Sequence, residues 1–198
     1  GSLWAMGENT SGQLGDGTTT NRNSPVQIVA SGVTQVVSGY NHSLFLKSDG
    51  SLWAMGQNTY GQLGDGTTTH RNSPVQVIAS GVATASAGYR HSLFLKSDGS
   101  LWAMGQNTSG QLGDGTTTQK TSPVQIVASG VTQIAAGAYH SLFLKSDGSL
   151  HATGMNSSGQ LGDGTTTQRT SPVQVVASSV SALSLGFYHS LFLKLDGS

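Results

Sequence analysis

Short apolar runs separated by turn residues recur along the whole chain. In the first 49 residues these runs are 3–6, 26–30, 33–38 and 43–47, each rich in β-branched or aromatic side chains and bounded by Gly, Pro, Asn or Ser. They predict four short strands. The dipeptide Asp49-Gly50 stands between two apolar runs, which is typical of a tight β-hairpin. The pattern therefore predicts an all-β fold.

The same pattern returns with a period of 49 residues. Gly-Ser-Leu begins at residues 1, 50, 99 and 148, so the chain divides into the units 1–49, 50–98, 99–147 and 148–196. Thirty of the 49 positions hold one residue type in all four units. Such likeness is typical of recent amplification or of design, and residues 1–198 are interpreted as a single repeat domain.

A unit of four short strands repeated every 40 to 50 residues is typical of a β-propeller built from four-stranded blades. Residues 50–66 (GSLWAMGQNTYGQLGDG), 73–77 (SPVQV) and 88–99 (GYRHSLFLKSDG) closely resemble the regulator of chromosome condensation repeat. The resemblance covers every unit and implies a propeller, usually of seven blades. Functions in that family range from chromatin binding with guanine-nucleotide exchange to inhibition of bacterial β-lactamases, so the fold alone does not define the function.

The strand order predicts an unpaired strand in the first unit and another in the last. Residues 1–7 lack the preceding strand of their hairpin, and residues 190–195 lack the following one. We expect these two segments to complete a terminal blade, and the apolar side chains that would close it are Leu3, Trp4, Met6, Leu191 and Leu193. Because four blades in one ring turn about 90° each and eight turn about 45°, we predict an eight-bladed homodimer. The alternatives are a closed four-bladed monomer and a piece of a longer protein.

Charge and composition narrow the possible partners. Nine basic and nine acidic residues leave no net charge, which disfavours nucleic acid and anionic lipid as general partners. The apolar stretches are far too short to span a membrane, and no signal-peptide pattern opens the chain. The lack of cysteine suits the cytoplasm but leaves the localisation open.

The recurring histidines do not predict a catalytic or metal site. His42, His91, His140 and His189 each precede a serine, but adjacent residues on a strand point to opposite faces. Histidines spread around a ring do not converge on one metal ion. We therefore expect structural histidines, no cofactor and no metal.

Two sets of loop residues are candidate contact surfaces. The set before each histidine varies between units and contains aromatic residues and arginine, which protein interfaces favour: Tyr40, Asn41, Tyr89, Arg90, Tyr139, Phe187 and Tyr188. The second set supplies one basic residue per unit and is a candidate anion-binding circle: Arg22, Arg71, Lys120 and Arg169.

These features favour a non-enzymatic scaffold that binds itself and an unknown protein partner. The competing interpretation is a guanine-nucleotide exchange or chromatin-binding regulator, as the resemblance implies. Exchange in that family depends on inserted loops, whereas every unit here has the same length. In the last unit His151 and Thr153 replace Trp and Met, which either weakens that blade or marks an asymmetric place in the ring.

Overall fold

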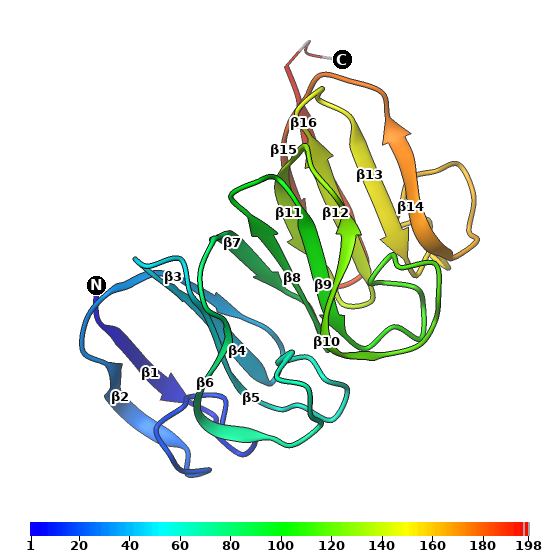
Figure 1. The fold of residues 1–198 in the computed structure, drawn as a ribbon. Helices are drawn as coiled ribbons and strands as arrows, with labels where there is room; N and C mark the ends of the chain where they lie inside the picture. Colours follow the sequence, from blue (N-terminus) through cyan, green and yellow to red (C-terminus); the bar gives the residue numbers. More distant parts are fainter. Residues whose placement is uncertain (196, 198) are drawn as a thin grey trace.

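The structure is a computed structural model that describes residues 1–195 and 197, and all of its regular elements are β-strands (Figure 1). The strands are β1 Leu3–Gly7, β2 Arg22–Val29, β3 Val33–Ser38, β4 His42–Lys47, β5 Leu52–Gly56, β6 Arg71–Ile78, β7 Val82–Ala87, β8 His91–Lys96, β9 Leu101–Gly105, β10 Lys120–Val127, β11 Val131–Ala136, β12 His140–Lys145, β13 Leu150–Gly154, β14 Arg169–Val176, β15 Val180–Leu185 and β16 Ser190–Lys194. The predicted all-β fold is confirmed. The described residues contain no helix that could cross a membrane.

The strands form three complete blades and two half-blades. The complete blades are the antiparallel sheets β3-β4-β5-β6, β7-β8-β9-β10 and β11-β12-β13-β14. The half-blades are β1-β2 and β15-β16. Each complete blade takes its two inner strands from one unit and its two outer strands from the next, so the predicted hairpin across each unit boundary is confirmed at all three boundaries.

The blades follow one another along an open arc (Figure 1). The first strands of successive blades, β3, β7, β11 and β15, are neighbours in turn, so they line the inside of the arc. The half-blade β1-β2 lies at one end of the arc and β15-β16 at the other (Figure 1). Among the described residues β1 pairs only with β2, and β16 pairs only with β15. A single chain therefore shows two open sheet edges.

The core lies between the faces of adjacent blades. Leu44 and Leu46 of one blade pack in a single buried cluster with Phe94 and Met104 of the next. The following boundary repeats this arrangement with Leu93, Leu95 and Phe143. The long loop of each unit also contributes a buried leucine, and these side chains are Leu14, Leu63, Leu112 and Leu161.

Candidate functional site

The exposed large apolar side chains are confined to the two ends of the arc. Among the described residues they all fall within 4–40 or 187–195, and they are Trp4, Met6, Val36, Tyr40, Phe187, Tyr188, Leu191, Phe192, Leu193 and Leu195. Inside the arc the equivalents of Met6 and of the exposed β16 residues are buried. Leu191 is 63% exposed, whereas its equivalents Leu44 and Leu142 are 1% exposed. The difference comes from the absence of a neighbouring blade at each end.

At the first end a groove separates β1 from the face of the blade that follows. The groove has a volume of about 290 Å³, and its lining includes Leu3, Met6, Leu14, Val36 and Met55. In a complete blade this space holds the two inner strands. The first half-blade lacks those strands, so its groove is open, and the polar residues Gln13, Ser38 and Ser43 line it beside the apolar ones.

At the other end β16 presents a matching apolar face. A groove of about 320 Å³ beside it is lined by Leu161, Gly162, Val175 and Phe192, among others. Within the arc the equivalents of Gly162 lie against the sulfur atoms of Met55 and Met104. Gly162 itself has only a Val175 methyl group nearby. The position that a methionine occupies at two internal boundaries is therefore empty at this end.

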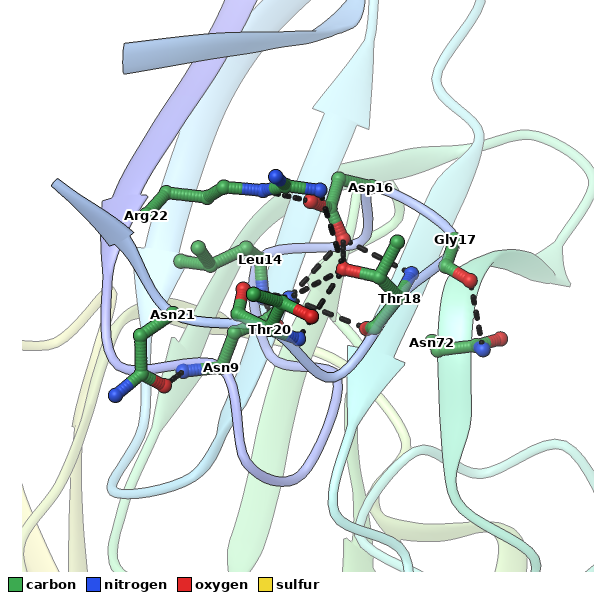
Figure 2. Close-up of polar contacts among 9 residues, drawn as sticks. All are labelled: Asn9, Leu14, Asp16, Gly17, Thr18, Thr20, Asn21, Arg22 and Asn72. Atoms are coloured by element: carbon green, nitrogen blue, oxygen red, sulfur yellow. Dashed lines mark hydrogen bonds and ion pairs between the residues drawn. The ribbon is translucent and has the colours of Figure 1, made fainter. Parts of the chain in front are cut away.

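The basic loop residues are paired within their own units. Arg22 donates to Asp16, which also accepts hydrogen bonds from Asn9 and Thr18 (Figure 2). The equivalent pairs are Arg71–Asp65 and Arg169–Asp163 at 2.7 Å, and Lys120–Asp114 at 3.1 Å. Although partial burial by itself raises the pKa of Asp16, hydrogen bonds from Thr18 and Arg22 lower it to about 2. Each basic charge is matched locally, so the structure gives the anion-binding interpretation no support.

The aromatic loop residues gather at one end of the innermost strands of the arc. Tyr40, Tyr89 and Phe187 border a cavity of about 270 Å³ at the ends of the innermost strands. The ring centroids of Tyr40 and Tyr89 are 4.4 Å apart, and those of Tyr89 and Phe187 are 5.6 Å apart. Tyr139 and Tyr188 extend the same cluster, with centroids 6.3 Å apart. The structure therefore brings the five aromatic candidates together.

The two other candidates of that set already have partners within the chain. The Arg90 guanidinium lies over the Tyr60 ring at 4.8 Å and over the Tyr89 ring at 4.7 Å, and it donates to the Tyr60 hydroxyl at 3.0 Å. The Asn41 carbonyl accepts the backbone N–H of Gln57 at 2.8 Å. These contacts fix the loops on which the aromatic rings are carried.

The recurring histidines link each blade to the next. His42, His91 and His140 are buried, and each imidazole Nε2 lies 2.9 to 3.0 Å from a serine hydroxyl of the following blade. Each of these serines donates to a loop carbonyl, so its oxygen accepts from an Nε2–H group. Because the hydroxyl proton is held by a carbonyl and the facing nitrogen already carries a proton, these pairs are not activated nucleophiles. The described residues contain no cluster suited to a metal ion.

The replacements in the last unit keep the packing of the blade. His151 stacks on Phe143 with ring centroids 5.1 Å apart, and its Nε2 atom lies within hydrogen-bond distance, 3.1 Å, of the Ser149 hydroxyl. Trp53 occupies the same place, stacked on Phe45 with its indole N–H on a serine. Thr153 donates to the Gly110 carbonyl at 2.9 Å. Both substitutions are therefore accommodated within a regular blade.

Comparison with known proteins identifies the repeat. The family model described as RCC1-like domain matches residues 1–198. A search of curated protein sequences finds no match.

Several solved structures have the same fold over nearly the whole of this chain. Yeast RCC1 (Prp20), solved bound to Kap60, matches with a TM-score of 0.85 and 21% identity over 98% of this chain and 50% of that one. Prp20p from Saccharomyces cerevisiae, studied for its binding to Gsp1p and histones, matches with a TM-score of 0.83 and 21% identity over 98% of this chain and 52% of that one. Human WBSCR16 matches with a TM-score of 0.67 and 21% identity over 96% of this chain and 67% of that one. The chain spans about half the length of the two yeast structures, and at this identity the likeness shows the fold.

Proposed function

The chain belongs to the RCC1-like propeller family, and we propose that it is a non-enzymatic, protein-binding scaffold whose ring is completed by a second copy of the same chain. One observation carries the proposal. Within the described residues every exposed large apolar side chain lies at an end of the arc, and for Met6 of β1 and the three exposed residues of β16 the equivalents are buried wherever a neighbouring blade is present. In the proposed dimer β16 of each copy pairs with β1 of the other, which gives eight blades.

The internal blades supply the register of this junction. In β12 and β13 the opposed residues run from His140↔Gly154 to Leu144↔Leu150. The same register places Leu191 opposite Ala5 of the partner subunit and Phe192 opposite Trp4 of the partner subunit. Phe45 stacks on Trp53 with centroids 6.1 Å apart, and Phe94 on Trp102 at 6.2 Å. Phe192 and the partner's Trp4 are expected to form the same stack.

Burial at two junctions favours the closed dimer. Leu3 is already buried in the single chain, so it adds little at the junction. Covering the exposed Trp4, Met6, Leu191 and Leu193 contributes about 1.5 to 3 kcal/mol for each side chain, and each ladder hydrogen bond adds about 1 kcal/mol net. Association costs about 4 to 15 kcal/mol and is incurred once per dimer, whereas the second junction forms within the complex. Closure therefore favours a ring over an open chain of copies.

The curvature of the arc supports a large ring. Nearly the whole chain superposes on half of yeast RCC1 (Prp20), so the step from blade to blade is similar in the two proteins. A closed four-bladed ring requires a step about twice that of an eight-bladed ring. Two arcs of this curvature are needed to approach a full circle.

The aromatic cluster at the ends of the innermost strands is the surface that we propose for a protein partner. Its members Tyr40, Phe187 and Tyr188 are about half exposed, and their identities differ between otherwise similar units. The yeast neighbours were solved or studied with the proteins Kap60, Gsp1p and histones, which supports a protein as the partner class. Equal unit lengths, with no inserted loop, disfavour nucleotide exchange by this chain.

A cysteine cross-link tests the junction directly, because the chain contains no cysteine. The double variant Ala5→Cys with Leu191→Cys nearly conserves the buried volume of that pair. Under mild oxidation it is expected to give a covalent dimer on a non-reducing gel, since opposed residues have Cβ atoms about 5 Å apart. The matched control combines Ala5→Cys with Phe192→Cys, whose side chains point to opposite faces. Equal cross-linking of the two variants, or none in the first, contradicts the proposed register.

A further inference from the structure

We propose that His189 of one copy and Ser43 of the other form the polar lock of each junction, and that this lock makes assembly of the ring sensitive to acid. The inference rests on the blade completion proposed above, and it assigns a role to the one recurring histidine that has no blade beyond it.

The internal boundaries between blades contain the equivalent histidine–serine contact. His42 reaches Ser92 over 2.9 Å, and His91 reaches Ser141 over 2.9 Å. The spacing is 50 residues, one more than the repeat, so each histidine binds the serine of the following blade. Both serine hydroxyls also donate to a backbone carbonyl, that of Gln62 at 2.8 Å and that of Gln111 at 2.7 Å.

The two ends of the arc each carry half of this contact. Ser43 donates to the Gln13 carbonyl at 2.8 Å, as its equivalents do, but has no imidazole partner among the described residues. His189 is exposed at the other end, on the loop before β16. In the closed ring the half-blade that contains His189 precedes the blade of the partner that contains Ser43. The repeat geometry therefore brings these two side chains together.

Burial makes this contact dependent on a neutral imidazole. In His42, His91 and His140 the Nδ1 atom is buried without a hydrogen-bond partner among the described residues. Since Nε2 holds the proton that the serine accepts, a second proton would have to go onto Nδ1. Burial accordingly lowers the pKa of His42 to about 4, of His91 to about 3 and of His140 to about 4.

His189 is exposed in the single chain and is expected to be buried, like its equivalents, when the ring closes. A charged imidazole buried there would have no partner for its second proton, so assembly favours the neutral form. The contribution to assembly is therefore present where the imidazole is neutral and is lost as the pH falls and the imidazole takes up a proton.

The groups around the junction do not compensate a charged imidazole. At the internal boundaries His42 faces Gly39, Gly56 and Ser92. By the same spacing, the residues expected to face His189 are Gly186 of its own chain and Gly7 and Ser43 of the partner subunit, all uncharged. The titratable groups nearby are His140 and Tyr188 of its own chain and Tyr40, His42 and Glu8 of the partner subunit. Glu8 is the single acid among them. It is exposed and accepts a hydrogen bond from the Thr10 hydroxyl at 2.9 Å, so water screens its charge.

The test is the dimer dissociation constant of the 198-residue chain between pH 8 and 5.5, measured by sedimentation. This window lies above the pKa values of the internal histidines. With one His189 in each of two junctions, the constant is expected to rise by up to about 100-fold per pH unit below about pH 6.5. His189→Gln keeps a neutral donor for Ser43 and is expected to remove the dependence. His70→Gln alters a histidine outside the series and is expected to keep it.

The outcomes separate this inference from the proposed function. A monomer at pH 8 overturns both. A dimer whose dissociation constant is unchanged from pH 8 to 5.5 overturns only the acid sensitivity. Equal pH dependence in His189→Gln and the unmodified chain overturns the assignment to His189.

Discussion

Leu191→Asp is expected to convert the proposed dimer into a folded monomer. Leu191 is 63% exposed in the single chain, so the substitution places little strain on the arc itself. In the closed ring the side chain takes the place of Leu44 or Leu142, which are 1% exposed, and a carboxylate there would be buried without a partner. Each junction loses about 1.5 to 3 kcal/mol of apolar burial, so two junctions weaken the dimer by about 100-fold to about 20,000-fold, and the buried carboxylate weakens it further. Light scattering measures the change.

Leu195→Asp is the matched control. Leu195 is 79% exposed, but the other units carry serine at its position, and these serines lie outside the core. The same change four residues further along is therefore expected to leave the dimer intact. If both variants dissociate equally, a general effect of added charge explains the result, and the blade-completion model is wrong.

Gly159→Ala is expected to block assembly by steric clash alone. Gly159 has a φ of +74° and nothing within 4 Å of an added Cβ. Its equivalents Gly12, Gly61 and Gly110 lie against backbone of the next unit, where an added Cβ would stand 2.6 Å from the nearest atom. In the proposed ring Gly159 would meet the equivalent backbone of the partner. With a clash costing about 1 to 3 kcal/mol at each of two junctions, we expect dimer affinity to fall between about 30-fold and about 10,000-fold.

Gly164→Ala controls for backbone strain. Gly164 has a φ of +76° and is equally open in the single chain. Its equivalents Gly17, Gly66 and Gly115 meet only a serine hydroxyl, at 3.6 to 3.7 Å. Both substitutions cost about 1 to 2 kcal/mol of left-handed strain in the monomer, which thermal unfolding measures. Only Gly159→Ala is expected to lose the dimer; unchanged affinity in that variant would mean that no neighbouring blade covers this end.

Much of the fold could be predicted from the sequence because the repeat shows its period, its strands and its hairpin at once. The main difference lies in the outer strand, which begins at Arg22 rather than near Val26. Arg22, Asn23 and Ser24 are polar, and Pro25 lacks an N–H group, so this segment does not resemble a strand. At the outer edge of a blade such residues are tolerated, because one side of the strand needs no partner.

The candidate sites were less predictable because their contacts cross unit boundaries. The rule that adjacent residues point to opposite faces correctly separates His42 from Ser43, but it gives no hint that His42 binds Ser92 in the next blade. A spacing of one repeat plus one residue was the available signal. The pairing of Arg22 with Asp16 was also missed. Both residues lie in one polar loop, and their contact depends on how that loop folds around Asn9.

The molar mass of the 198-residue chain in solution, measured by light scattering over a range of concentrations at pH 8, tests the proposed ring. Blade completion between two copies predicts twice the chain mass of 20.3 kDa, with no larger species, because the ring leaves no open edge. A constant mass of 20.3 kDa, or a mass that grows steadily with concentration, would contradict it.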